Sequence, residues 1–315
     1  MTKLLSLGEL LIDMLPQDSH NTAYLPIPGG APANVAVGYA KLGGSAAFCG
    51  GMGDDYFAKQ LTDALKQYNV GIEYLFTIKN AQTAMVIVSL DETGERSFNF
   101  YRHNTADLLL APEHLQQIQW DEISTLHFCS NTLTSIAIAN TTLSALKQAK
   151  IHNKLVSFDV NLRYSLWHNI RDIEPNVRAC YAHCDIIKLS RDELNFLAEH
   201  TSQSGDEYLQ SLLELGVSLI FLTDGPEPAT VYHKKFNVSE AAPIINAIDT
   251  TSAGDAFIAG VLYHLNHYNE TLLPIDKLNN KQVIKDALSF GLRCGSKACL
   301  LKGAFPALPV LDDVL

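Results

Sequence analysis

Short runs of apolar residues alternate along the chain with longer stretches in which apolar residues recur every three or four positions. The runs predict strands, and the recurring pattern predicts amphipathic helices between them. This alternation is typical of a mostly parallel sheet that helices cover on both faces. Strands are expected at 4–7, 125–129, 154–159, 185–189 and 218–222, and helices at 33–42, 55–68, 134–150 and 206–215.

Two segments, at about 11–28 and 83–103, interrupt this alternation. The strands expected within them form a small antiparallel sheet inserted in a single domain of residues 1–315. The turn between the last two strands is expected at 91–95, around Gly94, which suits a hairpin. Both segments leave the main sheet close to candidate site residues, so we interpret the small sheet as a lid, with an ordinary edge hairpin as the alternative. The strands are expected at 11–15, 23–27, 83–90 and 97–101.

Composition excludes several classes of protein. Of 315 residues, 47% are hydrophobic and 18% charged, which excludes a disordered chain. The net charge of −11 is unfavourable for nucleic-acid binding, since phosphate backbones need a basic face. Six cysteines without C-x-x-C spacing indicate reduced thiols. With neither a signal peptide nor an 18-residue apolar run, we expect a cytoplasmic protein without membrane contact.

The most informative motif is DTTSAGD at residues 249–255, which leads into an apolar helix. The first backbone N–H groups of a helix have no partner within it, and the helix dipole attracts anions there. Gly254 permits close approach of an anion. Asp255 beside this hole suits a general base that activates an alcohol for attack on a phosphoryl group. Simple helix capping is the alternative.

A second motif, PGGAPAN at residues 28–34, also precedes a helix. Its two glycines allow a ligand to approach the backbone, and Asn34 offers both a donor and an acceptor to sugar hydroxyls. Taken alone, such a motif is often only a turn. The P-loop signature is absent from the sequence, and so is G-x-G-x-x-G after the first strand. The second absence argues against a dinucleotide-dependent oxidoreductase.

With both motifs in this order and roughly 220 residues apart, the chain resembles the ribokinase-like (PfkB) family of carbohydrate kinases over essentially its whole length. Within that family it is most similar to the fructokinases. The fructokinase-like blocks are residues 8–15, 29–36, 94–102 with 106–107, and 158–163 with 166–167.

The resemblance implies a three-layer ribokinase-like fold and ATP-dependent phosphorylation of D-fructose at its 6-hydroxyl. Asp255 is then the base, and the amides of Ala253, Gly254 and Asp255 form the anion hole. Kinases for 2-keto-3-deoxygluconate, an aminoimidazole riboside or a nucleoside remain alternatives. So does a non-catalytic member of the family that only binds its ligands.

For the sugar, the resemblance implies contacts from Asp13, Gly30 and Asn34. Hydrogen bonds of this kind are how proteins recognise sugar hydroxyls. Arg102 and Arg163 are expected near the sugar or the transferred phosphate, where a guanidinium stabilises developing charge. A surface salt bridge is the alternative for either arginine.

For the nucleotide, the resemblance implies a role for Glu193 in organising magnesium and the phosphates. Ser190 stands where the family has Asn. Thr223 and Gly225 match a turn that contacts the nucleotide, although Asp224 between them adds negative charge there. Residues 287–301 are expected to line the adenine.

Two further features follow only from the resemblance. Relatives often bind a monovalent cation such as potassium, which points to Asp249, Thr251 and Gly303. They also often form homodimers through the lid. The apolar lid residues expected to face the second copy are Met85, Ile87, Phe98 and Phe100.

Overall fold

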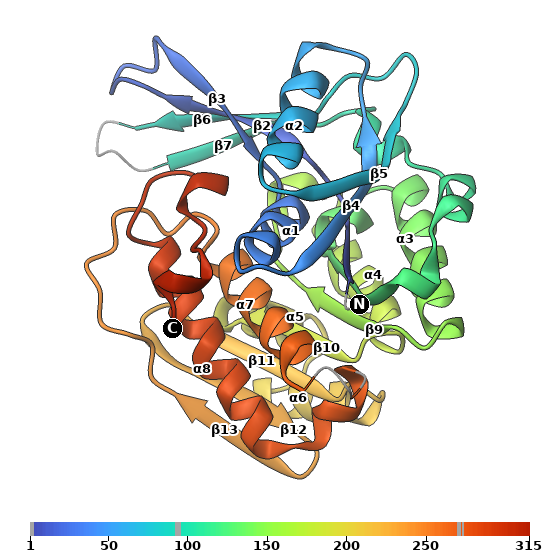
Figure 1. Ribbon diagram of the computed structural model, residues 1–315, viewed down its shortest axis with the longest axis vertical. Helices are drawn as coiled ribbons and strands as arrows, with labels where there is room; N and C mark the ends of the chain where they lie inside the picture. The colour runs from blue at the N-terminus through green and yellow to red at the C-terminus, as the bar shows by residue number, and fades with distance from the viewer. Residues whose placement is uncertain (1–2, 92–95, 270–271, 273) are drawn as a thin grey trace.

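The computed structural model describes residues 3–91, 96–269, 272 and 274–315 (Figure 1). Among these residues, a nine-stranded sheet has the order β13-β12-β11-β10-β9-β8-β1-β4-β5. All pairs from β5 to β11 are parallel, whereas β11–β12 and β12–β13 are antiparallel, so the expected mostly parallel sheet is confirmed. The strands are β1 (Lys3–Leu7), β4 (Ser45–Met52), β5 (Val70–Thr77), β8 (Ile123–Cys129), β9 (Leu155–Asp159), β10 (Ile186–Ser190), β11 (Leu219–Asp224), β12 (Glu227–His233) and β13 (Phe236–Glu240).

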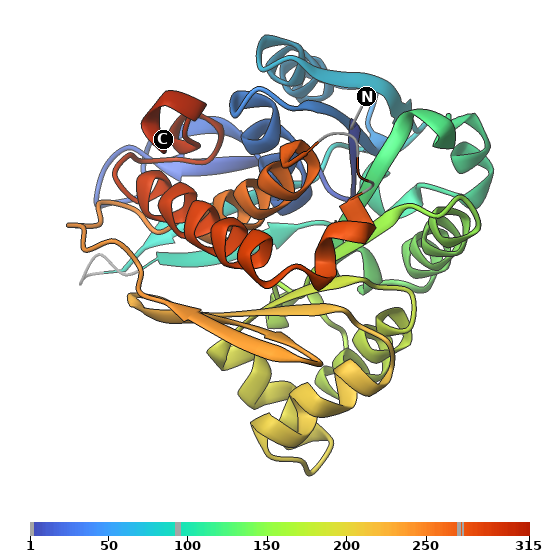
Figure 2. The same cartoon turned by 60° about the horizontal axis from the view of Figure 1, so that its bottom comes forward.

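Helices cover both faces of this sheet and enclose two apolar cores, which confirms the three-layer arrangement. Figure 2 shows α7 and α8 on one side of the strands and the green to yellow helices on the other. The first layer contains α1 (Ala31–Lys41), α2 (Tyr56–Gln67), α7 (Ala253–His267) and α8 (Lys281–Ala298). The second contains α3 (Ile136–Ile151), α4 (Ile173–Tyr181), α5 (Arg191–His200) and α6 (Gly205–Glu214). Every helix in the described part of the chain is too short or too polar to span a bilayer.

Short 3₁₀ helices complete the connections between these elements. They lie at Ala106–Leu109, Pro112–Gln117, Trp120–Glu122, Ser130–Leu133, Tyr164–Leu166, Ile170–Asp172, Pro274–Asn279, Phe305–Ala307 and Leu311–Asp313.

The small sheet is present as expected, with the order β3-β2-β6-β7. The β2–β3 and β6–β7 pairs are antiparallel hairpins, and the parallel β2–β6 pair joins them. In Figure 1 it projects from the main sheet at the upper left. The turn predicted at 91–95 falls largely on residues 92–95, which lie outside the described residues. The strands are β2 (Leu11–Pro16), β3 (Tyr24–Gly29), β6 (Met85–Leu90) and β7 (Arg96–Tyr101).

The apolar residues of the lid do not share one face in the way the sequence suggested. Phe100 lies opposite Val86 in the antiparallel β6–β7 pair, and residues directly opposite one another share a face. Met85 and Ile87 alternate with Val86, so they point to the other face. Phe98, opposite Val88, shares the face of Phe100. The expectation of a single exposed face with Met85, Ile87, Phe98 and Phe100 is therefore wrong.

The order of the main sheet locates the site. From β1 the chain adds β4 and β5 on one side and β8 to β11 on the other. Connections leaving neighbouring strands in opposite directions open a crevice at their carboxyl ends, where open α/β sheets bind ligands. Helix α1 packs against β1, β4 and α7. This packing brings the N-termini of α1 and α7 together near the switch point.

Close packing of α7 on α8 holds the helix that carries Asp255. A Cβ added to Gly260 would lie 2.6 Å from Cys294 Sγ and 3.2 Å from the Cα of Gly291. Gly260→Ala is therefore expected to lower the free energy of unfolding by about 1–3 kcal/mol, because overpacking outweighs the better helix propensity of alanine. Urea unfolding measures this change.

The matched control is Gly205→Ala, at the start of α6. There the added Cβ would meet its nearest neighbour, Leu194, at 3.4 Å, which is ordinary van der Waals contact. This variant is expected to unfold at or above the wild-type midpoint. Equal stability of the two alanine variants would show that the α7–α8 contact is not tight.

Candidate active site

A cleft of about 970 Å³ lies between the lid and the carboxyl ends of the main strands. It brings together most of the residues that the sequence singled out. Arg102, Thr223, Gly225 and Gly303 are not in its lining. The predicted residues that do line it are Asp13, Gly30, Asn34, Arg163, Ser190, Glu193, Asp249, Thr251, Ala253, Gly254 and Asp255.

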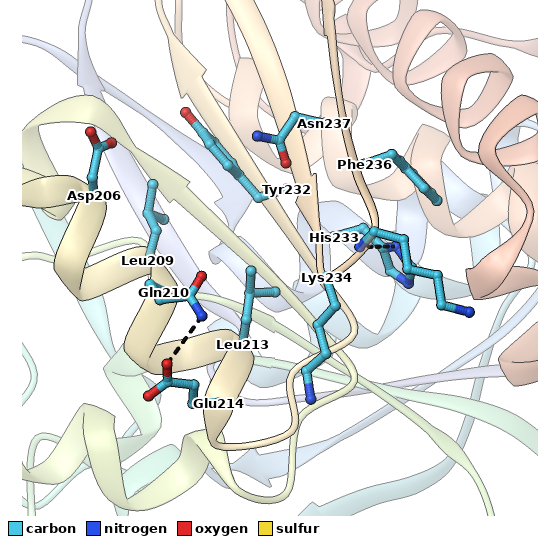
Figure 3. A pocket seen from close by; sticks show the side chains of 11 residues that line it. Asp206, Leu209, Gln210, Leu213, Glu214, Tyr232, His233, Lys234, Phe236 and Asn237 are labelled. Carbon is cyan, nitrogen blue, oxygen red and sulfur yellow. Dashed lines mark hydrogen bonds between the residues drawn. The ribbon is translucent and has the colours of Figure 1, made fainter.

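A second cleft, of about 940 Å³, lies between α6 and the β12–β13 hairpin (Figure 3). Leu209 and Leu213 form the apolar side of this cleft. Gln210 Nε2 donates a hydrogen bond to Glu214 Oε1 at 3.0 Å. The sequence predicts no site residue here. The chemistry therefore lies in the first cleft.

Asp255 occupies the first turn of α7 and is held by α1. Asn34 Nδ2 donates to Asp255 Oδ2 at 2.7 Å and to Ser252 Oγ at 3.0 Å. Ser252 does not cap the helix with its side chain, because it adopts a left-handed conformation with φ of 61°. No described residue donates a hydrogen bond to the other carboxylate oxygen of Asp255. That oxygen is available to a ligand in the cleft.

The amides at this helix end only partly match the predicted anion hole. The N–H of Ala253 donates to the carbonyl of Thr250 at 3.2 Å, so it is already engaged in a turn. The amides of Gly254 and Asp255 have no acceptor among the described residues, as expected for the start of a helix. The hole is therefore reduced from three amides to two, and Arg163 is exposed at the rim of the cleft beside it.

A buried charge cluster surrounds Asp255. Burial, reinforced by repulsion from Asp159, raises the pKa of Asp255 to about 7, while Asn34, Lys188 and Arg163 act in the opposite direction. Lys188 Nζ forms an ion pair with Asp159 Oδ1 at 3.0 Å. A carboxyl group that titrates near neutrality is well matched to accepting and releasing a proton at physiological pH.

The sugar-side residues lie on β2 and at the entry to α1. A Cβ on Gly29 would lie 2.2 Å from Asp13 Oδ2, and one on Gly30, which has φ of 112°, would lie 2.4 Å from the carbonyl oxygen of Glu9. Only glycines therefore let these segments approach so closely. Burial raises the pKa of Asp13 to about 7, with Arg163 lowering it and Glu9 adding to the rise.

Arg102 does not reach the cleft. It is buried in an ion pair with Asp107, and its Nη1 donates to the carbonyl of Asn131 at 3.0 Å and to Thr134 Oγ1 at 3.3 Å. Its expected contact with sugar or phosphate stays a prediction. In the structure, Arg102 stabilises the turn that follows β8. One residue of this turn, Asn131, lines the cleft and was not singled out from the sequence.

The residues predicted for the nucleotide lie at the ends of β10 and β11. Ser190 caps α5 by accepting from the N–H of Glu193 at 3.2 Å, and Thr223 lies beside Ser190 in the parallel register. Glu193 Oε2 accepts from the N–H of Ser190 at 2.7 Å, and its Oε1 from the N–H of Leu162 at 2.8 Å. Glu193 thus ties the loops after β9 and β10 together.

The turn after β11 explains the unexpected acidic residue. Gly225 adopts φ of 55° there, which favours glycine. Asp224 Oδ2 lies 3.3 Å from Arg191 Nε, so the charge of Asp224 has a cationic partner. Residues 287–301, expected near the adenine, belong mainly to α8 and lie outside the lining of the first cleft.

The residues predicted for a monovalent cation do lie together. Asp249 Oδ1 accepts from the backbone N–H of Thr251 at 3.0 Å and from its hydroxyl at 2.6 Å. Asp249 Oδ2 accepts from the N–H of Gly303 at 3.1 Å. This buried carboxylate therefore joins the loop before α7 to the loop after α8.

Comparison with known proteins agrees with this geometry. A model of the pfkB family of carbohydrate kinases matches residues 1–311. Probable fructokinase-5 of Arabidopsis thaliana is 36% identical over 315 residues, which cover 98% of this chain and 95% of the relative. A crystal structure of fructokinase with bound ATP from Xylella fastidiosa has a TM-score of 0.93 and 35% identity, covering 99% of this chain and 96% of the other.

A fructokinase double mutant from Vibrio cholerae O395, solved with fructose, ADP and a potassium ion, has a TM-score of 0.88 and 34% identity, covering 100% of this chain and 98% of the other. The family match and these relatives identify a phosphotransferase with an alcohol acceptor, and the three-layer fold agrees with this class. The chain belongs to the pfkB family of carbohydrate kinases and is an ATP-dependent sugar kinase.

The raised pKa of Asp255 makes a prediction about stability. A carboxyl group whose pKa rises from 3.8 to about 7 on folding binds its proton more tightly in the folded state. Ionisation of Asp255 therefore lowers the free energy of unfolding. The full loss applies above about pH 7, and there is no loss below about pH 4. Asp255→Asn is expected to be more stable than the wild type at about pH 8, by an amount that shrinks as the pH falls. Urea unfolding across this pH range measures the difference.

Asp18→Asn is a control of opposite sign. Hydrogen bonds from Thr22 and neighbouring backbone amides lower the pKa of exposed Asp18, so its ionised form stabilises the fold. This variant is expected to be less stable than the wild type at about pH 8. A constant difference between Asp255→Asn and the wild type at every pH would contradict the raised pKa.

Proposed function

We propose that the chain is a fructokinase, which transfers the γ-phosphoryl group of ATP to the 6-hydroxyl of D-fructose. The observation that carries this proposal is Asp255, a buried carboxylate with one oxygen held by Asn34 and a pKa of about 7, beside two unpaired amides. The relatives named above carry the name fructokinase, and this chain matches them over nearly their full length. Their names support the choice of sugar.

In this mechanism Asp255 accepts the proton of the 6-hydroxyl as its oxygen attacks phosphorus. The fixed hydrogen bond from Asn34 to Oδ2 leaves Oδ1 for the hydroxyl. The amides of Gly254 and Asp255 and the guanidinium of Arg163 stabilise the negative charge on the transferred group. Because these donors are already oriented by α7 and the loop after β9, little reorganisation is needed during the reaction.

The sugar lies between the lid and α1 in this proposal. Asp13 accepts hydroxyl hydrogen bonds, Gly30 allows close approach to the backbone, and Asn34 Oδ1, which is buried without a partner among the described residues, accepts another. Phe98 and Phe100 line the lid side of the cleft and exclude water from the transferred group.

ATP enters along the ends of β10 and β11, beside Ser190, Thr223 and Gly225. The hydroxyl of Ser190 replaces the family amide and is already used as a helix cap. Magnesium accompanies the phosphates, and the carboxylates that line this side of the cleft are those of Asp159 and Glu193.

A monovalent cation beside the anion hole is part of the same proposal. The carboxylate of Asp249 accepts from the backbone N–H groups of both Thr251 and Gly303, so the two loops that carry these residues meet at its oxygens. Oxygen ligands of this kind suit potassium. The proposed compartment is the cytoplasm, and the six buried cysteines, all unpaired, fit a reducing environment.

We also propose a homodimer formed through the lid, with the cleft face of the lid as the contacting face. Leu25 and Phe98 lie on the cleft face of the lid and are 47% and 49% exposed. Large apolar side chains left exposed beside a binding cleft are typical of a surface that a partner covers.

The test of the proposed function is kcat/KM across fructose, ribose, glucose and 2-keto-3-deoxygluconate, in an assay that couples ADP formation to absorbance. Fructose is expected to give the highest value, and omission of potassium is expected to lower it. With fructose, kcat/KM is expected to rise with pH through about 7 as Asp255 ionises.

Asp255→Asn is the matched variant for this assay, since it preserves the shape of the side chain. Its kcat with fructose is expected to fall roughly 10²–10⁴-fold. Near-normal turnover in this variant would refute the assignment of the base. A higher kcat/KM for another sugar would replace fructose as the substrate and leave the kinase chemistry intact.

Light scattering tests the dimer. The wild type is expected to show twice the chain mass of 34.6 kDa, and Leu25→Glu the mass of a single chain. Ile136→Glu on α3 is the control, because Ile136 is 83% exposed on another face and its replacement is expected to leave the dimer intact. A wild-type mass near that of one chain refutes the proposed dimer.

A further inference from the structure

Asn131 is a cleft residue whose amide has a fixed orientation. It lies in the Ser130–Leu133 turn after β8 and is 5% exposed. Its Nδ2 donates to Glu9 Oε1 at 2.8 Å, and the same oxygen accepts from the backbone N–H of Ala31 at 3.3 Å. Since a backbone N–H can only donate, Glu9 Oε1 is an acceptor, and the NH₂ group of Asn131 must face it.

This orientation leaves Asn131 Oδ1 turned away from Glu9. Oδ1 is buried and has no hydrogen-bond partner among the described residues. A buried amide oxygen without a donor is costly, and folded proteins rarely leave one unpaired. Among the described residues that line the cleft, the other fully buried amide oxygen without a partner is that of Asn34, which belongs to the proposed sugar site.

The surroundings of Asn131 hold it in place before any ligand binds. Its carbonyl accepts from Arg102 Nη1 at 3.0 Å and from Thr134 Oγ1 at 2.9 Å. Arg102 is itself fixed by the buried ion pair with Asp107. These bonds hold the backbone of Asn131, and the bond from its Nδ2 to Glu9 holds the side chain. A side chain so restrained loses little conformational freedom on binding, which favours its use in recognition.

We propose that Asn131 is a specificity-determining residue, whose Oδ1 accepts a hydrogen bond from a hydroxyl of the acceptor sugar other than the one that is phosphorylated. The donor must be a hydroxyl or an amine, because a carbonyl oxygen cannot pair with an acceptor or with an apolar group. The proposal rests on the proposed function. It adds to the sugar site a contact from the turn after β8, a strand that lies on the opposite side of β1 from β4.

The test compares the wild type with Asn131→Ala on fructose and on analogues that each lack one hydroxyl: 1-deoxy-, 3-deoxy- and 4-deoxyfructose, and 2,5-anhydromannitol, which lacks the anomeric hydroxyl. For the wild type, removal of the hydroxyl that Asn131 contacts is expected to lower kcat/KM roughly tenfold or more. In Asn131→Ala, the same removal is expected to change kcat/KM less than threefold, because the acceptor is gone.

Fructose itself is expected to lose roughly tenfold or more in kcat/KM with Asn131→Ala, mainly through KM, while the KM for ATP stays near the wild-type value. Thr134→Val is the matched control, since it loosens the same turn but leaves Oδ1 in place. It is expected to retain the wild-type penalty for each analogue. Asn131→Leu, which fills the same volume without an acceptor, replaces the alanine variant if that variant does not fold.

Equal penalties for every analogue in the wild type and in Asn131→Ala would overturn the proposal and show that Asn131 only supports the turn. If the wild type does not phosphorylate fructose, the proposed function fails separately. The comparison then uses deoxy analogues of whichever panel sugar gives the highest kcat/KM, and the same two outcomes decide the role of Asn131.

Discussion

The hydrogen bond between Asn34 and Asp255 joins the two halves of the active site. Asn34 lies one turn into α1 and Asp255 in the first turn of α7, so 221 positions of sequence separate donor and acceptor. The contact requires the N-termini of both helices to meet above the sheet. That meeting depends in turn on α1 packing between β1, β4 and α7. The proposed sugar loop and the proposed anion hole are therefore positioned as one unit.

The same contact connects the fold to the chemistry through electrostatics. Burial makes ionisation of Asp255 costly, and neighbouring Asp159 increases that cost. The hydrogen bond from Asn34 and the charges of Lys188 and Arg163 recover part of it. The carboxyl group is thus kept near the point where either protonation state is accessible, which a residue that takes and releases a proton requires.

Much of the fold was predictable because periodicity reports directly on burial. The parallel strands β1, β8, β9, β10 and β11 were all expected, whereas β4 (Ser45–Met52), β5 and the antiparallel strands β12 and β13 were missed. In β4, Phe48 is the only β-branched or aromatic residue, so the signal typical of strands is weak there. At the site, DTTSAGD located Asp255 from local chemistry alone. The alternation of apolar and polar residues does not show which face of the lid meets the cleft. Phe100 was therefore expected on the outer face, whereas it lines the cleft. Asn131 lies in a turn without periodic signal, and only the unpaired state of its Oδ1 in three dimensions distinguishes it.

Gly254 shows why several requirements converge on one residue. A Cβ there would lie 2.9 Å from Lys188 Nζ, and although an ammonium at the end of a long side chain can usually move, this one is held by Asp159 at 3.0 Å. Burial opposes the charge on Lys188, but Asp159 and Glu193 raise the pKa of Lys188, so the cation is retained. A larger residue at 254 would push the ammonium of Lys188 away from Asp159. Glycine at 254 therefore suits both the proposed approach of an anion and the charge balance that sets the protonation of Asp255.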